Sequence, residues 1–143
     1  MMFCVLEPEF AGPLGPRKVV NQSVHPPEVS SLHIEFDMEA WRGDDLLEAY
    51  PCFLVTENLR RVIEKFAKGG FQFDSLRQTR LGPPRKLQPF QPLPQLWWLK
   101  VTGQAGLDEI GLAENHCLVV DEQVVFEMKR HCQLNNCNIY PFV

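Results

Sequence analysis

Hydrophobic residues recur along this chain in two spacings, one typical of strands and one typical of amphipathic helices. Residues 52–55, Cys-Phe-Leu-Val, form an uninterrupted apolar run of the kind found in buried strands. Apolar side chains then recur at the i, i+3, i+4 and i+7 positions of one helix face, at Leu59, Val62, Ile63 and Phe66. Thr56 is placed to act as N-cap, Gly69-Gly70 to end the helix, and residues 71–73 to form a second strand. The pattern predicts a strand–helix–strand unit over residues 52–74.

The same order of features returns near the C-terminus. An apolar strand is expected at residues 117–120, Asp121 is placed as N-cap, and residues 137–140 read as a strand after Asn135-Asn136. The apolar positions of the intervening helix are Val124, Val125, Met128 and Cys132. When the two units are aligned, the pairs Cys52/Cys117, Val55/Val120 and Glu57/Glu122 are identical. We interpret residues 52–74 and 117–140 as an internal repeat.

Outside these units, the alternation of apolar and polar residues predicts strands at residues 2–6, 32–36 and 96–101. A short helix is expected over Gly43–Tyr50. Five prolines between residues 77 and 95 predict a surface loop there, because proline removes a backbone donor and breaks helices and central strands. Residues 8–30 and 102–116 are rich in loop-forming residues. The expected fold is a single domain, residues 1–143, of α/β or α+β class, with a mixed sheet and helices packed on it.

Length and composition exclude several classes of protein. The chain has 143 residues, of which 45% are hydrophobic and 22% charged, as in an ordinary globular domain. Its formal net charge of −4 gives no electrostatic reason to expect nucleic acid or an anionic membrane as partner. No apolar run approaches the roughly 20 residues of a membrane span, and the N-terminus lacks the basic region of a signal peptide. A cytoplasmic location is the expectation.

The five cysteines lie in apolar surroundings and are odd in number, which favours free thiols in the core over a disulfide framework. His116-Cys117, His131-Cys132 and Cys137 could in principle bind zinc, but zinc sites favour closely spaced cysteine pairs on a loop. We therefore expect no metal and no cofactor.

Candidate catalytic chemistry is sparse. No nucleophile elbow and no glycine-rich phosphate loop is present. His33, Glu35 and Asp37 would project from one side of a strand, where they could perform acid–base chemistry. The alternative is the ordinary solvated face of an edge strand, which carries polar residues at the same spacing.

Residues 35–48 combine acidic and large apolar side chains with a single basic residue, Arg42. Such a surface suits docking onto a basic cleft of another protein. The alternative is a solvated acidic face that Trp41 anchors to the core. The candidate partner-binding residues, with two from the following loop region, are Glu35, Asp37, Glu39, Trp41, Asp44, Asp45, Glu48, Asp108 and Glu109.

Several stretches resemble a group of small bacterial proteins of unknown biochemistry that includes immunity proteins of polymorphic toxin systems. These stretches are residues 5–9 (VLEPE), 33–37 (HIEFD), 41–45 (WRGDD), 53–57 (FLVTE), 96–103, 108–112 (DEIGL) and 118–120. The resemblance implies a cytosolic protein that binds and blocks a cognate toxin, without identifying the toxin.

The sequence thus favours a non-enzymatic protein-binding domain, with an immunity protein as its specific form. Two alternatives stay open. One is a small enzyme that uses His33, Glu35 and Asp37. The other is a homodimer or larger structural homo-oligomer that associates through the proline-rich loop and through Trp97 or Trp98, since neighbouring strand residues point to opposite faces of the sheet.

Overall fold

The computed structural model describes most of the chain. The residues outside its described part are 1, 13–19, 22–27, 30–31, 38–40 and 81–93. Glu39 of the expected partner surface and most of the proline-rich segment therefore lie outside the described residues. No helix in the described part of the chain is both long and apolar enough to cross a membrane.

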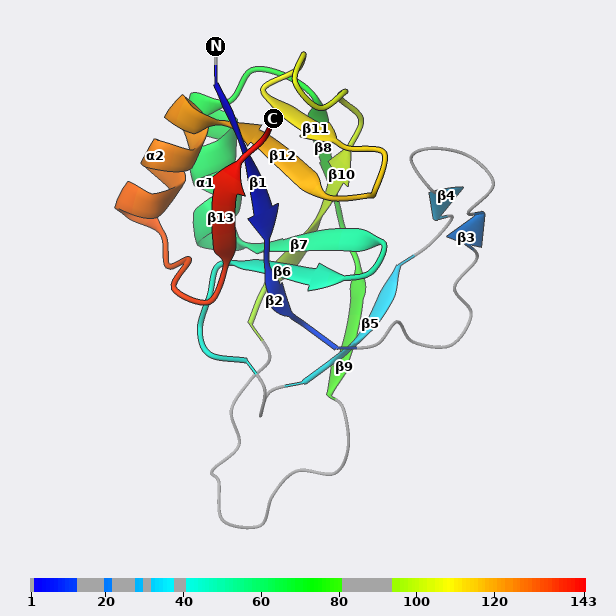
Figure 1. The fold of residues 1–143 in the computed structure, drawn as a ribbon. Coiled ribbons are helices and arrows are strands. Elements are labelled where there is room, and N and C mark those ends of the chain that lie inside the picture. The colour runs from blue at the N-terminus through cyan, green and yellow to red at the C-terminus, as the bar shows by residue number, and fades with distance from the viewer. Residues whose placement is uncertain (1, 13–19, 22–27, 30–31, 38–40, 81–93) are drawn as a thin grey trace.

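Two sheets and two helices make up the body of the fold (Figure 1). Sheet A has the strand order β11 (Ile110–Leu112), β12 (Leu118–Asp121), β1 (Phe3–Glu7) and β13 (Asn138–Pro141). Sheet B has the order β2 (Glu9–Phe10), β6 (Leu46–Ala49), β7 (Cys52–Thr56), β10 (Leu96–Val101) and β8 (Phe71–Asp74). The helices are α1 (Glu57–Phe66) and α2 (Glu122–His131).

Two further strand pairs lie beside this body. β5 (His33–Phe36) pairs in parallel with β9 (Arg77–Arg80), and β3 (Val20–Asn21) pairs with β4 (Glu28–Val29). Two helices packed against sheets, of which sheet B is mixed and sheet A antiparallel, confirm the expected α/β or α+β class with a mixed sheet.

Both expected strand–helix–strand units are present. In addition, each unit has a strand from elsewhere in the chain between its two strands, and a further strand beside them. In sheet B, β10 runs antiparallel to both β7 and β8, so it separates the two parallel strands of the first unit. In sheet A, β1 runs antiparallel to both β12 and β13 and separates those of the second unit. Each unit is therefore a split β-α-β motif. An antiparallel strand extends each sheet at the same side, β6 next to β7 and β11 next to β12.

The two helices correspond residue for residue. Each has ten residues and begins after an N-cap whose side chain accepts a backbone N–H: Thr56 accepts from Leu59 at 3.4 Å, and Asp121 from Gln123 at 2.8 Å. Each ends at a C-cap in extended conformation, Ala67 or Cys132, whose N–H returns to the helix. The helices therefore stop before Gly69-Gly70 and Asn135-Asn136, the residues expected to end them.

One large core lies between the sheets and the helices. It includes the helix-facing residues of both sheets and the buried residues of α1 and α2. A second core lies on the other face of sheet B, where Leu32, Ile34 and Phe36 of the β5 region cover it. Trp97 packs half-buried against the first core and Trp98 is buried in the second, so the neighbouring tryptophans do point to opposite faces, and the chain's own layer covers Trp98.

Residues 8–30, expected to be loop, contain the two-residue strands β2, β3 and β4. Three further expectations about local structure are wrong. The expected helix over Gly43–Tyr50 is instead β6, because Leu46 and Leu47 are both fully buried on opposite faces of sheet B. Residues 77–80 form β9 rather than loop, and residues 110–112 of the expected loop 102–116 form β11. β9 pairs with β5, which is distant in sequence, whereas β6 and β11 each pair with the strand that follows them, so strand pairing decides the conformation in all three.

Candidate functional site

Asp44, one of the expected partner-binding acids, is fully buried. Its carboxylate accepts hydrogen bonds from the backbone N–H of Asn136 at 2.8 Å and from the Asn136 side-chain amide at 3.1 Å. The Gln133 amide adds a third at 3.3 Å. The expectation that Asp44 faces a partner is therefore wrong, because its hydrogen bonds hold the turn after α2.

Asp45 acts beside it in the same way. Its side chain accepts from the Thr56 hydroxyl at 2.6 Å and from the Gln133 backbone N–H at 2.7 Å. Its own backbone N–H donates to the Gln133 carbonyl at 2.9 Å, and its carbonyl accepts from the Thr56 N–H at 3.0 Å. Asp45 thus joins the start of β6 in one unit to the end of α2 in the other.

A matching clamp forms at the equivalent place of the second unit. The Glu109 carboxylate accepts from the backbone N–H of Lys68, just after α1, at 3.2 Å. The Glu109 carbonyl accepts from the Asp121 N–H at 2.8 Å, as Asp45 accepts from Thr56. Asp108 is exposed and accepts from the Gln104 backbone N–H at 2.7 Å. The two acidic pairs, Asp44 with Asp45 and Asp108 with Glu109, therefore accept hydrogen bonds from backbone N–H groups of this chain and hold its turns in place.

The remaining expected residues lie on and around β5. Glu35 and Asp37 are half-buried, and His33 hydrogen-bonds Thr79 of the neighbouring β9 with 3.0 Å between Nε2 and Oγ1. Trp41 packs edge-on against Phe36 and donates to the Asp44 carbonyl at 3.0 Å. Trp41 thus anchors its segment to the core, as the alternative interpretation of residues 35–48 expects.

Glu48, on β6, lines a cavity of about 390 Å³ where the two sheets meet. Glu7, at the end of β1, lies in the same cavity, and Tyr50, His116 and Cys117 form part of its wall. The turn before β12 places His116 at a φ of 67°, a left-handed conformation uncommon outside glycine. This cavity draws together strands and turns from both units.

The acidic residues of this cavity raise the pKa values of neighbouring groups. Burial raises the pKa of the Glu48 carboxyl, and the nearby Glu7 carboxylate raises it further. A hydrogen bond to Glu7, followed by burial, raises the pKa of Tyr140 to about 12. Burial, then Glu7 and Glu48, raises the pKa of the Cys117 thiol. Cys117 is therefore a poor nucleophile, although it lies in a cavity beside a histidine.

A larger groove, of about 750 Å³, adjoins this cavity at Asn115. It lies over the outer face of sheet A, where Phe3, Val5 and Val119 form a small third core. Its apolar lining comes from Ala105, Leu112, Ala113 and Phe142, and Glu114 is its charged residue.

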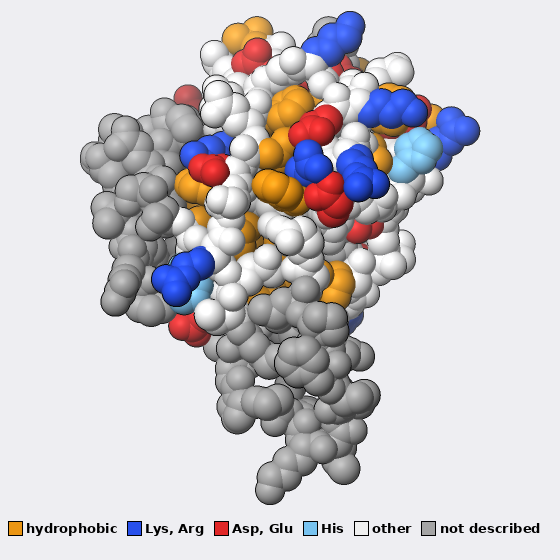
Figure 2. Space-filling view, turned by 180° about the vertical axis from the view of Figure 1, so that it is seen from behind, with side chains coloured by type: hydrophobic (Ala, Val, Ile, Leu, Met, Phe, Trp, Pro, Cys, Tyr) orange, Lys and Arg blue, Asp and Glu red, His pale blue; other side chains and the backbone are white. Residues whose placement is uncertain are grey.

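The two hollows have one sign of charge. Among the described residues that line them, Glu7, Glu48 and Glu114 are acidic and none is lysine or arginine. Tyr50 and Tyr140 stand beside them with 51% and 43% of their surface exposed. On the face of the molecule drawn in Figure 2, by contrast, acidic and basic side chains are interspersed.

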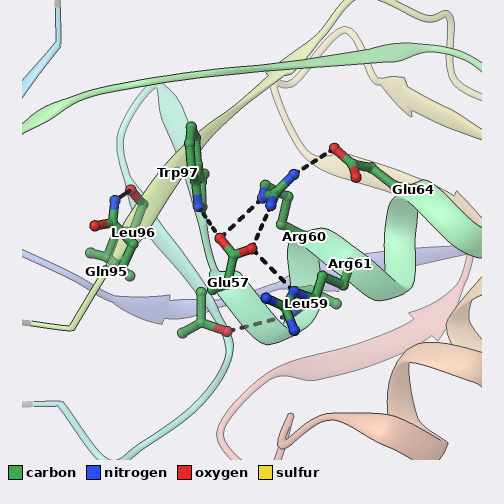
Figure 3. A network of polar contacts seen from close by, with 9 residues as sticks. Glu57, Leu59, Arg60, Arg61, Glu64, Gln95, Leu96 and Trp97 are labelled. Carbon is green, nitrogen blue, oxygen red and sulfur yellow. Dashed lines mark hydrogen bonds and ion pairs between the residues drawn. The ribbon is translucent and has the colours of Figure 1, made fainter.

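An ordered network of charged side chains lies at the start of α1 (Figure 3). The Glu57 carboxylate accepts from the Trp97 indole at 2.5 Å, from Arg61 at 3.2 Å and from two nitrogens of Arg60. The Arg60 guanidinium also lies 4.8 Å above the Trp97 ring. These contacts, with the Arg60 hydrogen bond as the largest cause, lower the pKa of Glu57 to about 2. The network fastens α1 to β10.

The cysteines are all free thiols, as expected, although only Cys52 is fully buried. Within the described residues, no three His, Cys, Asp or Glu side chains are grouped so as to hold a metal ion. Comparisons of the chain with protein families, with characterised proteins and with solved structures found no match.

Sequence reasoning identified Glu48 and the segment 102–116 but missed Glu7, Tyr50, Tyr140 and Phe142 as parts of this surface. Glu7 and Tyr140 are opposite ends of the chain brought together by the pairing of β1 with β13. No local pattern in the sequence marks that pairing.

Proposed function

We propose that the chain is a non-enzymatic protein-binding domain that receives a basic segment of its partner on the outer face of sheet A. The observation that carries the proposal is a comparison between the two units. Their strand registers match, so Trp98 and Leu54 of sheet B occupy the positions of Val5 and Val119 in sheet A. In sheet B this outer face is covered by the β5–β9 layer. In sheet A no strand layer covers the equivalent face: its residues are buried beneath loop residues and Phe142, and Ala105, Ala113 and Phe142 of this covering line the groove.

The chemistry of the groove supports a partner with positive charge. An apolar floor bordered by carboxylates and exposed tyrosines has the composition of a protein interface, with an aromatic centre and a polar rim. Among the described lining residues no lysine or arginine accompanies the carboxylates, and such a surface attracts a cationic partner and repels an anionic one. A toxin with a basic active-site cleft is one such partner, and an immunity protein that blocks the cleft is the specific form of the proposal.

The test is co-expression and binding with the product of the adjacent gene. We expect that product to be toxic alone, harmless with this chain, and bound by it in purified form. A triple variant, Glu7→Gln, Glu48→Gln and Glu114→Gln, should raise the dissociation constant about tenfold, if each lost charge contact contributes about 0.5 kcal/mol.

A control triple variant with the same change in net charge places its substitutions on the helices, at Glu64, Glu122 and Glu127. It should bind like the wild type. Hydrogen exchange of the complex should show protection at residues 102–117 and in β13. Binding that is equally strong in both triple variants, or that leaves these segments unprotected, contradicts the proposed surface.

A further inference from the structure

The two sheets end in equivalent strands with different backbone chemistry. β8 is one edge strand of sheet B, opposite β2, and β13 is one edge strand of sheet A, opposite β11. In an antiparallel pair, hydrogen-bonded residues alternate with residues whose N–H and C=O point away from the neighbouring strand. One hydrogen bond between an edge strand and its neighbour therefore shows which residues of the edge strand turn their N–H and C=O groups to the open side.

At β13 a proline occupies one of the outward-facing positions. The Phe142 N–H donates to the Phe3 carbonyl at 2.9 Å, so the alternation turns Ile139 and Pro141 toward the open side. Pro141 has no N–H to offer a further strand. Proline at such a position is a common device against edge-to-edge pairing.

At β8 the edge is open. The Thr102 N–H donates to the Gly70 carbonyl at 2.9 Å, so the alternation turns the backbone groups of Phe71 and Phe73 outward. Neither residue is proline, so each has both an N–H and a C=O, and no strand in the described part of the chain pairs with them on this side. Among the described strands, β8 is paired with β10 alone.

The side chains at this edge are also incompletely covered. Phe71 and Phe73 are half-buried and pack edge-on with 5.5 Å between ring centroids. Trp97 is half-buried on the same face of the sheet, held by the Glu57 network (Figure 3). Three aromatic side chains therefore lie at the margin of the large core, next to unpaired backbone groups.

We propose that β8 pairs with β8 of a second copy of this chain, antiparallel about a two-fold axis through Gln72. In this register Phe71 lies opposite Phe73 of the second copy, and both outward-facing residues of each strand form hydrogen-bonded pairs. Aromatic cross-strand pairs form on one face, and the exposed Gln72 side chains meet on the other.

The charges at the edge are compatible with self-association. Asp74 is ion-paired with Lys100 at 2.8 Å, and the register places it opposite Gly70 rather than opposite a second acid. Self-pairing therefore opposes no like charges on the strand. A two-fold interface of this kind is isologous, with the same patch on both copies. It lies on sheet B, so it is independent of the proposed binding surface on sheet A.

The experiment uses the residue at the axis. Gln72→Lys or Gln72→Glu places two like charges opposite each other in the dimer, while the exposed side chain leaves the monomer fold intact. We expect wild-type protein to sediment at twice its 16.5 kDa mass and each variant to dissociate about fivefold more readily. A mixture of the two variants should form a heterodimer tighter than either homodimer. The matched control is Asn138→Lys at the equivalent position of β13, which should leave the dimer unchanged.

Three results would overturn the proposal: a wild-type protein that stays monomeric at every concentration reached, a dimer insensitive to both charge variants, or a mixture that gains no affinity. A monomer whose β8 instead pairs with another protein gives the first result. Loss of toxin or partner binding in the sheet A variants would not affect these measurements, so the two proposals fail separately.

Discussion

Replacing Asp44 by alanine should destabilise the protein far more than replacing its counterpart Asp108. Asp44 is fully buried and accepts two well-formed hydrogen bonds from Asn136 and a longer one from Gln133. A hydrogen bond to a charged group contributes about 1.5–3 kcal/mol, and truncation leaves the two donors of the half-buried Asn136 without this acceptor. Loss of the two shorter bonds therefore predicts a decrease of about 3–5 kcal/mol in the free energy of unfolding.

The assay is urea unfolding, followed by tryptophan fluorescence and far-ultraviolet circular dichroism. The midpoint should fall with little change in slope, since the same surface is exposed on unfolding. Asp108→Ala removes one exposed contact, to the Gln104 N–H, and should cost about 1 kcal/mol or less. Asp44→Asn keeps the volume but turns an acceptor oxygen into a donor facing the donors of Asn136, so its effect should lie between the two. Equal stabilities of the Asp44→Ala and Asp108→Ala variants would refute the assignment of Asp44 to a structural clamp.

Three further predictions concern other parts of the structure. Glu57 has a pKa of about 2 in the folded protein against an ordinary 4.5, so its contribution to stability is present above pH 4.5 and is lost as the pH falls toward 2. Urea titrations at several pH values should show that Glu57→Gln weakens this dependence of stability on pH, while Glu122→Gln does not. Burial raises the pKa of Cys52 to about 12, so site-resolved mass spectrometry at pH 8 should show alkylation by iodoacetamide only after unfolding, and rapid alkylation of the native protein would contradict this. Gly70 has a φ of 94° and a Cβ there would overlap the Ile110 carbonyl oxygen, so Gly70→Ala should cost more than about 2 kcal/mol, whereas Gly69→Ala, which has open space, should be nearly neutral in thermal unfolding.

The sequence predicted those elements whose signals are local. The apolar run of β7, the stripe of α1 and the Thr56 cap all lie within one short stretch, and each has a direct physical cause in it. β6 was mispredicted because Leu46 and Leu47 become strand residues only by pairing with β7 between two cores. The helix ends were misplaced because Gly70 has its positive φ in the turn before β8 rather than at the cap.

The acidic residues show the same limit for the candidate site. An acid is expected at the surface unless something pairs with it, and the partners of Asp44 and Asp45 lie in the turn after α2, in the other unit. Glu48, which the sequence predicts to bind a partner, lines a cavity, but its neighbour Glu7 there comes from β1, far away in sequence. Contacts between the units, which no window of sequence contains, decide which acids are structural and which line a cavity.

The correspondence of the two units supplies its own comparison for locating function. Where both units use equivalent residues in the same way, as Asp45 and Glu109 do in binding the residue after the opposite helix, the shared role is structural. Where the two units differ, the common architecture does not account for the difference, and a function specific to one unit can. The outer face of sheet B is covered by the β5–β9 layer and that of sheet A by residues that line a groove, while edge strand β13 contains a proline and edge strand β8 contains none. These differences predict two separate interfaces, one for a basic partner on sheet A and one for a second copy at β8.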